Sequence, residues 1–313
     1  MPKSFADVRV LVLGAHTGAL QFYLRRFPAP GDYLVAHRYR EAADGGKGSN
    51  QAIAAARLGA RVTLISAVGD DTPGRAALDY MRREGIDVGP VLISRDHPTG
   101  LGAGFYLEDG SVMGATHLGA TVDLTAEYLD AHREVFAAGY DVFLASLEVP
   151  ADVVLHGLAL ARESGIPLRV LNPSPADDLP GRALSDVDVL TPNEPEGRLL
   201  AGLAPDGDDP SREVARRVAA RHEVPLVLMT LGSAGCYALG RGLDEPVPCP
   251  RVQAVDTSGA GDCLNASISI GLAAGRPLRD AVGFALRAAS ISVTRPDSWP
   301  AFPTAAEVTA FGA

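Results

Sequence analysis

A short run in the last quarter of the sequence places an acid at the start of a predicted helix. Residues 256–262 read Asp-Thr-Ser-Gly-Ala-Gly-Asp, and Cys263–Gly275 has helical spacing and good helix formers. Small residues at 258–261 let the backbone approach a ligand closely, and the following helix directs unpaired N–H groups and its positive dipole end to the same place. This arrangement is typical of a phosphate site, where Asp262 could accept a proton from an attacking hydroxyl group. An ordinary helix start with a favourable first-turn acid explains the run equally well when it is taken alone.

A second glycine-rich run, Gly45–Asn50, precedes the helical stretch Gln51–Leu58. Its glycines permit close approach to a ligand, while Lys47 and Asn50 can hydrogen-bond sugar hydroxyls. The run is not a Walker A loop, because that pattern requires a glycine where this sequence has Glu41. An ordinary glycine-rich loop before a helix is the structural alternative.

Two further loops follow predicted strands. Asn193 and Glu196 lie within the run Thr-Pro-Asn-Glu-Pro-Glu at 191–196, one helical turn apart, so both can reach a water-bound Mg²⁺ and the phosphates that it neutralises. Plain helix capping selects the same residue types. The loop 230–235, Thr-Leu-Gly-Ser-Ala-Gly, ends another strand, and ligands bind at the carboxyl ends of strands in open α/β sheets.

The rest of the chain predicts an α/β body with helices on both faces of a mostly parallel sheet. Several short runs would place apolar side chains on both faces of a strand, which is typical of parallel strands covered by helices. The predicted strands are Val8–Gly14, Val62–Val68, Asp141–Ala145, Leu168–Leu171, Val187–Leu190 and Leu226–Thr230. The predicted helices are Asn50–Leu58, Pro73–Glu84, Thr125–Ala137, Ala151–Glu163 and Ser211–His222.

Two regions depart from this alternation of strands and helices. Phe22–Tyr39 and Val91–Thr116 alternate like exposed antiparallel strands, and the second resembles a hairpin with its turn at 108–110. We therefore expect a small β-lid, formed by residues 17–44 and 90–118, that projects from the body.

Composition narrows the classes of function. The net charge of -10 argues against a nucleic-acid partner, which would need clustered Lys and Arg, but leaves room for a single bound nucleotide. The three cysteines form no CxxC pair, and the apolar run Val8–Ala15 is too short for a membrane span. Since no linker composition interrupts the chain, we predict one domain, 1–313, without a membrane partner, in the reducing cytoplasm.

In their order along the chain, these motifs resemble the ribokinase-like (PfkB) family of carbohydrate and nucleoside kinases, and its ribokinase branch most closely. The resemblance extends from Val10 to about Phe302. Besides the runs above, it rests on Gly14 with Phe27-Pro28-Ala29-Pro30-Gly31, Val68-Gly69-Asp70-Asp71, Pro98-Thr99-Gly100, Leu147-Glu148, Leu171-Asn172-Pro173-Ser174-Pro175 and Ser292-Val293-Thr294-Arg295.

The resemblance implies a three-layer α/β/α fold with a β-lid over the substrate and ATP at the carboxyl ends of the strands. It implies that Asp262 is the catalytic base and that Gly259, Ala260 and Gly261 form the anion hole, with Gly261 also next to ATP. By position, it assigns Gly46, Lys47, Asn50, Glu148 and Asp262 to the sugar, Asn193, Thr230, Gly232 and Gly235 to ATP, and Asn193 and Glu196 to Mg²⁺ held through water.

The family also holds a monovalent cation, such as K⁺, beside the anion hole, and Asp256 and Ser258 match residues that ligate it. Two departures weaken this site: a hydroxyl-bearing position is Ala301 here, and a family glycine is Asp297. A homodimer formed through the lid is a further arrangement that the resemblance allows.

The larger departures follow Gly14. The family's sugar-binding Asn is Thr17, which we keep as a candidate substrate contact, and its sugar-binding Asp is Ala19. Ribose itself is therefore in doubt as the substrate. His16 could contact a substrate, although a lone histidine at a strand end is more often structural.

We accordingly predict an ATP-dependent kinase that phosphorylates a hydroxyl of a pentose or pentose derivative. The alternative within the family is a nucleoside kinase, for which Phe22, Tyr23, Phe105 and Tyr106 are the available lid aromatics. A non-catalytic sugar or nucleotide sensor would not need Asp262 opposite an anion hole. The sequence supports a dinucleotide dehydrogenase least, because the run after Gly14 does not form the G-x-G-x-x-G pattern that binds dinucleotides.

Overall fold

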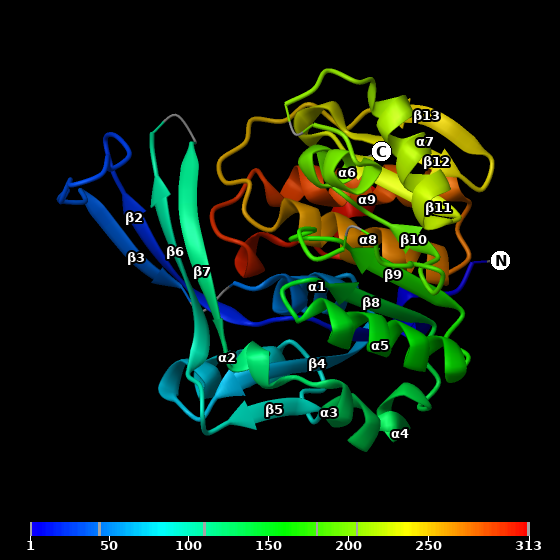
Figure 1. Ribbon diagram of the computed structural model, residues 1–313, viewed down its shortest axis with the longest axis horizontal. Helices are drawn as coiled ribbons and strands as arrows, with labels where there is room; N and C mark the ends of the chain where they lie inside the picture. The colour runs from blue at the N-terminus through cyan, green and yellow to red at the C-terminus, as the bar shows by residue number, and fades with distance from the viewer. Residues whose placement is uncertain (1, 43–44, 109–110, 180, 205, 312–313) are drawn as a thin grey trace.

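A nine-stranded sheet forms the centre of the molecule. The computed structural model describes residues 2–42, 45–108, 111–179, 181–204 and 206–311. The strand order is β13-β12-β11-β10-β9-β8-β1-β4-β5, and all neighbours from β11 to β5 run parallel (Figure 1). The bounds are β1 Arg9–Leu13, β4 Arg61–Gly69, β5 Val91–Ser94, β8 Val142–Ser146, β9 Leu168–Asn172, β10 Val189–Leu190, β11 Leu226–Thr230, β12 Cys236–Gly240 and β13 Leu243–Val247.

Helices cover both faces of this sheet, and the central strand shows why. In β1, Val10 and Val12 enter one apolar core while Leu11 and Leu13 enter the other, because successive side chains of a strand alternate. The first core is closed by α1 Lys47–Arg57, α2 Thr72–Arg83, α8 Ala260–Ala273, α9 Leu278–Ser292 and α10 Ala305–Ala310. The second is closed by α3 Ala126–Ala131, α4 Arg133–Phe136, α5 Ala151–Glu163, α6 Glu194–Ala201 and α7 Ser211–His222.

The predicted three-layer α/β body is confirmed, and the predicted strands and helices recur with shifted ends. One predicted helix, Thr125–Ala137, is divided at His132 into α3 and α4. The antiparallel pair β12 and β13, which extends the sheet beyond β11, is not among the predicted strands. The edge strand β13, Leu-Asp-Glu-Pro-Val, has an exposed polar face and lacks the kind of apolar run by which the central strands were recognised.

A second, four-stranded sheet forms the lid, which stands apart from the body in Figure 1. Its order is β3-β2-β6-β7, with β2 Thr17–Tyr23, β3 Arg38–Ala42, β6 Thr99–Tyr106 and β7 Val112–Gly119. The pairs β2–β3 and β6–β7 are antiparallel as expected, but β2 and β6 run parallel. Both leave the same edge of the body, since β2 follows β1 and β6 follows β5, and parallel strands of one sheet end at one edge.

The lid segments differ from the predictions at two points. Residues 24–37, most of the predicted strand region Phe22–Tyr39, connect β2 to β3 without regular strand structure. Strand β5, Val91–Ser94, pairs with β4 in the large sheet, so the second lid segment begins at Thr99. The predicted hairpin between β6 and β7 is present, but residues 109–110 of its turn lie outside the described residues.

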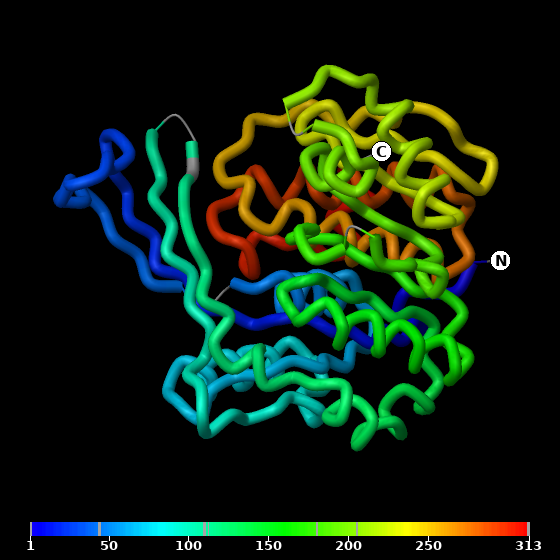
Figure 2. The backbone as a smooth tube through the Cα atoms, viewed as in Figure 1, coloured from blue at the N-terminus to red at the C-terminus, as the bar shows by residue number. Residues whose placement is uncertain are grey.

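The backbone trace in Figure 2 shows that the chain enters the lid twice and returns to the body each time, while both termini lie on the body. Within the described ranges, no helix is long and apolar enough to cross a membrane.

Candidate active site

The predicted base, Asp262, lies in the first turn of α8 and is buried. Its two carboxylate oxygens accept hydrogen bonds from neighbouring residues of α1. The Nδ2 of Asn50 donates to Oδ2 at 2.9 Å, and the Nε2 of Gln51 donates to Oδ1 at 3.1 Å. Two amide donors thus hold the carboxylate in one orientation.

Two charged residues lie around this carboxylate. Glu148, just after β8, accepts a hydrogen bond at 2.6 Å from the backbone N–H of Lys47, the first residue of α1. That N–H belongs to a helix start and has no partner within its helix, so the Glu148 carboxylate satisfies it. The predicted sugar contacts Lys47, Asn50 and Glu148 are therefore brought together with Asp262.

Electrostatics at this centre reflect burial opposed by ion pairing. Burial raises the pKa of Asp262, while Lys47 and the amides of Asn50 and Gln51 oppose the rise. Burial also raises the pKa of Glu148 against the attraction of Lys47. Burial alone would lower the pKa of Lys47, but the carboxylates of Asp262, Glu148 and Glu196 outweigh it and raise that pKa.

Close backbone contact positions the start of α1 against β1. A Cβ added to Gly48 would lie 2.3 Å from the carbonyl carbon of Gly14, so only glycine permits this approach. Gly46 has a φ of 80°, in the left-handed region, and a Cβ there would lie 2.6 Å from the Ala15 carbonyl oxygen. The glycines of this loop thus place Lys47 and Asn50 at the carboxyl end of β1.

The predicted anion hole lies at the start of α8. Gly259 caps the helix with a φ of 73°, and a Cβ there would lie within 3.0 Å of Phe302 and Ser298. The N–H of Ala260 donates to the carbonyl of Thr257 at 3.3 Å, so this donor has a partner within the turn. A Cβ added to Gly261, by contrast, would meet no heavy atom within 4 Å, which leaves space for a phosphoryl group.

The predicted nucleotide and Mg²⁺ residues lie at the carboxyl ends of neighbouring strands. Asn193 and Glu196 form a capping box at the start of α6: Asn193 Oδ1 accepts from the N–H of Glu196 at 2.8 Å, and Glu196 Oε2 accepts from the N–H of Asn193 at 2.9 Å. Asn193 also bridges Thr230 at the end of β11. Carboxylate oxygens suit Mg²⁺, and the second carboxylate oxygen of Glu196, Oε1, is not used in the capping box, so this residue fits the ion through a bound water.

The other loop expected at the nucleotide follows Thr230. Residues Gly232–Ala234 form a 3₁₀ turn, which Gly235 ends with a φ of 101°. The N–H of Leu231 donates to the carbonyl of Gly235 at 2.8 Å and closes the loop. A Cβ on Gly232 would meet nothing within 4 Å, so its face is open to a ligand.

The predicted monovalent-cation residues also lie beside the anion hole. The carboxylate of Asp256 accepts from the N–H of Ser258 at 2.8 Å and from the N–H of Asp297 at 3.1 Å. Asp297 has a φ of 73°, which explains why the family pattern has glycine there. Ala301 is buried and supplies no side-chain oxygen, so the residues fit a cation only in part.

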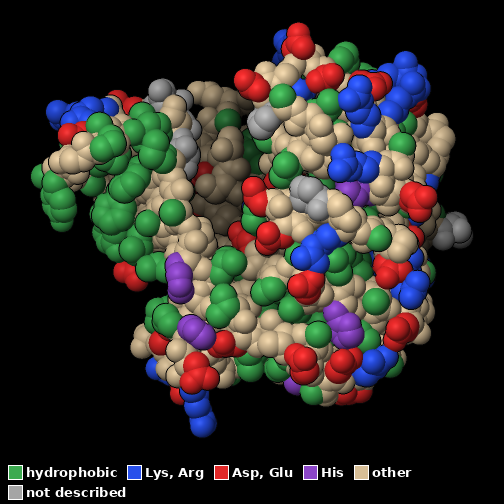
Figure 3. Space-filling model, viewed as in Figure 1, with side chains coloured by type: hydrophobic (Ala, Val, Ile, Leu, Met, Phe, Trp, Pro, Cys, Tyr) green, Lys and Arg blue, Asp and Glu red, His purple; other side chains and the backbone are tan. Residues whose placement is uncertain are grey.

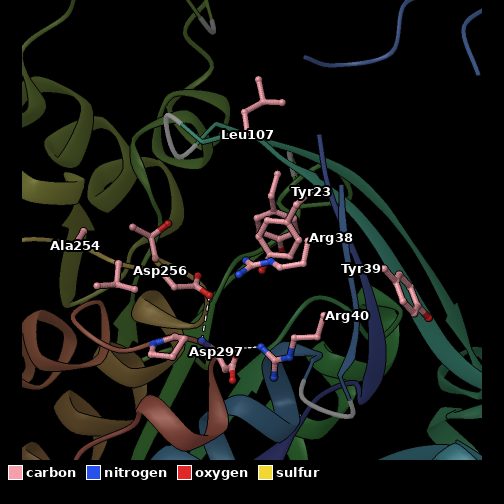
Figure 4. A pocket seen from close by; sticks show the side chains of 12 residues that line it. Tyr23, Arg38, Tyr39, Arg40, Leu107, Ala254, Asp256 and Asp297 are labelled. Atoms are coloured by element: carbon pink, nitrogen blue, oxygen red, sulfur yellow. Dashed lines mark hydrogen bonds and ion pairs between the residues drawn. The ribbon is translucent and has the colours of Figure 1, made fainter. Parts of the chain in front are cut away.

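A cleft of about 740 Å³ separates the lid from the body. Figure 3 shows the hollow, and Figure 4 shows Arg38 and Arg40 of β3 facing Asp256 and Asp297 across it, while Tyr39 points away. Arg40 forms an ion pair with Asp297 that links the lid to the body. The Arg38 guanidinium lies 3.5 Å from the ring centroid of Tyr23.

The residues that depart from the family pattern lie where β1 passes into the lid. Thr17 is buried, and its N–H donates to the carbonyl of Gly45 at 3.2 Å. Ala19 pairs with Gly102 and lies on the same face of β2 as Tyr23, which lines the cleft. His16 is buried against Ser49, 3.1 Å from its hydroxyl, and burial lowers its pKa to about 4, so it is neutral and held as a structural residue.

Sequence reasoning missed two residues of this site. Gln51 donates to Asp262, although adjacent helix residues such as Asn50 and Gln51 point about 100° apart and no pattern predicts that both reach one carboxylate. Trp299 donates its indole N–H to Asn50 at 2.9 Å. Trp299 is the only Trp in the sequence and lies between Ser298 and Pro300, and this is the signal that could have marked it as a candidate site residue.

Comparison with known proteins agrees with this arrangement. The chain is 33% identical over 285 residues to the ribokinase of Haemophilus influenzae, covering 91% of this chain and 92% of that protein. It is 30% identical over 256 residues to the deoxyribokinase of Salmonella typhi, covering 82% of each. The crystal structure of ribokinase from Cryptococcus neoformans in complex with ADP superimposes with a TM-score of 0.83 at 28% identity, covering 97% of this chain and 98% of that one.

The family model described as pfkB family carbohydrate kinase matches residues 9–305, nearly the whole chain. The resemblance seen in the motifs is thereby confirmed, together with the fold and the class of enzyme. This protein belongs to the pfkB family of carbohydrate kinases, with a ribokinase-like fold and a β-lid over its cleft.

Proposed function

We propose that this enzyme transfers the γ-phosphoryl group of ATP to a hydroxyl of a pentose or a pentose derivative, with Asp262 as the general base. The observation that supports this most directly is the buried Asp262 carboxylate, which two amides hold in the first turn of α8. The preceding residue, Gly261, faces open space. Base and phosphate site are thus adjacent, as in-line transfer requires.

The step follows from these positions. A sugar hydroxyl bound near Lys47 and Glu148 gives its proton to Asp262 as its oxygen attacks the γ-phosphorus. The new O–P bond forms while the bond to the leaving oxygen breaks, and ADP departs. N–H groups at the start of α8, with Gly261 among them, stabilise the charge on the transferred group.

Among pentoses, we propose a substrate less hydroxylated than ribose. Ala19 replaces the carboxylate that the family pattern uses for sugar hydroxyls, and it lies on the cleft face of the lid. A deoxyribokinase stands among the relatives at 30% identity. A cleft wall without this acceptor suits a sugar that lacks the corresponding hydroxyl, because no donor is left unpaired.

The test is ADP release from ATP with a panel of ribose, deoxyribose, other pentoses, ketoses, tetroses and nucleosides. We expect the highest kcat/KM with a pentose other than ribose. A nucleoside preferred over every free sugar would favour the second candidate function, nucleoside phosphorylation. Binding of a sugar and ATP without any turnover would indicate a sensor.

The nucleoside kinase remains the second candidate because of two aromatic residues on the cleft face of the lid. Tyr23 and Tyr106 stack with ring centroids 5.3 Å apart and line the cleft, where they could receive a base. Phe22 lies on the opposite face, packed against Phe105 and Tyr39, and is turned away from the cleft.

ATP use requires a divalent ion, and we propose that Asn193 and Glu196 organise Mg²⁺ through water. Bound Mg²⁺ would neutralise charge on the phosphates. The oxygen of Glu196 that is not used in the capping box is the group available for a bound water. Chelation of divalent ions should therefore abolish turnover.

We further propose that a monovalent cation near Asp256 and Ser258 supports the anion hole. Activity should rise when K⁺ replaces a large organic cation at constant ionic strength, because a cation beside the start of α8 adds positive potential where phosphate charge develops. The absence of a hydroxyl at Ala301 predicts a weak site, so the response should need high K⁺. Equal rates in the two salts across that range would remove the cation from the mechanism.

We propose that two copies pair through the outer face of the lid. This face exposes Tyr39, Leu101 and Met113 by 52%, 43% and 48%, and Figure 3 shows apolar side chains covering it. Sedimentation should give a dimer that Leu101→Arg weakens, whereas Val122→Arg, an equally exposed position (49%) outside the lid strands, should not. A monomer in the unaltered protein would contradict the proposal.

Three free cysteines and the dependence on ATP support a location in the reducing cytoplasm. We also propose that the whole chain is one functional domain, in which both lid segments close over the same cleft. The Arg40–Asp297 ion pair supports this, since it ties the lid to the loop beside the anion hole.

A further inference from the structure

The hydrogen bonds at Asp262 continue one residue further, to the single Trp of the chain. Trp299 begins a 3₁₀ turn after α9 and is buried. Its indole N–H donates to Oδ1 of Asn50 at 2.9 Å, and Nδ2 of the same amide donates to Asp262 at 2.9 Å. Asn50 thus connects Trp299 to the base.

The direction of these bonds matters, because an indole nitrogen can only donate. The oxygen of the Asn50 amide must therefore face Trp299, and its NH₂ group must face Asp262. A rotated amide would place two acceptors, Oδ1 of Asn50 and a carboxylate oxygen of Asp262, against each other in a buried site. Trp299 selects the orientation in which the amide holds the carboxylate.

Trp299 is itself fixed by packing. Its ring lies 4.8 Å from the ring of Tyr80 and 5.8 Å from that of His16, measured between centroids. The Tyr80 hydroxyl accepts from Arg57 at 3.2 Å, and Arg57 pairs with Glu84 at 2.9 Å. A residue held so firmly can impose an orientation on its partner.

We propose that Trp299 is a positioning residue for phosphoryl transfer, whose indole N–H fixes the Asn50 amide so that Asp262 is held ready to accept the proton of the attacking hydroxyl. This inference rests on the proposed role of Asp262 as base. Trp299 itself touches neither sugar nor nucleotide in this scheme, and it acts only through Asn50.

A pH profile separates this role from general packing. The charged and titratable groups around Asp262 are Lys47, Glu148 and the Cys263 thiol. None of them changes when the indole N–H is removed, whereas the donor from Asn50 is then no longer oriented. The carboxylate becomes less favoured relative to the acid, so the acidic limb of the kcat/KM profile should move to higher pH.

The sharpest test exploits the single Trp. Biosynthetic replacement of tryptophan by benzothienylalanine alters only residue 299, and it substitutes sulfur for the N–H while the ring keeps its shape. We expect kcat to fall about threefold to tenfold, as for one buried hydrogen bond, with little change in the KM for ATP. The acidic limb should shift upward at the same time.

Genetic variants complete the design. Trp299→Phe should reproduce the loss in the wild-type background but add little to Asn50→Ala, since both changes break one chain of hydrogen bonds. Ser269→Ala is the matched control: it removes a different buried hydrogen bond, from Oγ of Ser269 to the carbonyl oxygen of Asn265 within α8, so it should leave kcat and the pH profile unchanged.

An unshifted acidic limb with unchanged kcat in the benzothienylalanine protein would overturn the inference, as would full additivity of Trp299→Phe and Asn50→Ala. Asp262→Asn, measured beside these variants, separates the proposed role of Asp262 as base from the proposed role of Trp299. If that variant keeps full turnover, the proposed function itself fails. If it loses turnover while the tryptophan analogue has no effect, only the role of Trp299 fails.

Discussion

Replacing Asp262 by Asn should lower turnover by roughly 10² to 10⁴, the usual contribution of a general base, while nucleotide binding persists. The substitution keeps the size of the side chain in a buried position at the start of α8. It removes the negative charge that takes the proton. Steady-state kinetics with the best panel substrate and a direct ADP titration measure the two effects separately.

The neighbours of Asp262 make a control necessary. Asn50 and Gln51 both donate to the carboxylate, and an Asn at 262 can accept from only one of them with its oxygen, so some stability should be lost. Asp280→Asn is the control. Asp280 is an exposed acid in the first turn of the adjacent helix α9, so its replacement should leave turnover unchanged. Unchanged phosphoryl transfer in folded Asp262→Asn protein would exclude this residue as the base.

The same base predicts the pH dependence of the reaction. Burial raises the pKa of Asp262, and a base must be ionised to accept a proton. Activity should therefore fall as the pH decreases through a value above the ordinary range of a carboxyl group. A kcat/KM profile that stays flat down to the ordinary range of an Asp side chain would contradict this expectation.

Restoring the family's sugar-binding pair, with Ala19→Asp and Thr17→Asn together, should improve kcat/KM for ribose by about tenfold to a hundredfold. A carboxylate that accepts from sugar hydroxyls makes charge-assisted bonds worth roughly 1.5–3 kcal/mol each. Position 19 lies on the same face of β2 as Tyr23, which lines the cleft, so we expect the new carboxylate to face a sugar bound there.

In the double variant, kcat/KM for the true substrate should fall while kcat/KM for ribose rises. The less hydroxylated or bulkier part of the true substrate would meet a desolvated charge there. Leu20→Asp is the matched control, because the next residue of the strand points to the outer face and its carboxylate should not alter the ratio of the two substrates. Efficient ribose kinetics in the unaltered enzyme, with no gain in the double variant, would show that other residues bind the sugar.

Much of the fold was predictable from local pattern. The buried parallel strands were recognised because segments such as Val142–Ala145 carry apolar side chains on both faces, and this is a property of the segment alone. The start of α8 was equally predictable as a helix start, since small residues and glycines at 258–261 are followed by helix formers; its role as an anion-binding turn was predicted only together with the other motifs. The order of such motifs sufficed to place the chain in its family.

Pairing between distant segments was less predictable. Strand β5 resembles a lid strand in its sequence, yet it joins the large sheet because β4 leaves an open edge beside it. The edge strand β13 escaped notice for the related reason that it has no apolar run of its own and is held by pairing with β12, which in turn pairs with β11.

The sequence by itself determined the class of enzyme, and it predicted the turn that we propose to receive phosphate and the acid beside it, because each of these depends on residues close together in the chain. Only the tertiary structure decided how that acid is held. Asn50 and Gln51 donate to Asp262, and Trp299 donates to Asn50, each across more than 200 residues of sequence, through α1, α8 and the turn after α9. Side-chain hydrogen bonds of this kind depend on the packing of three separate elements, and no spacing within one element encodes them.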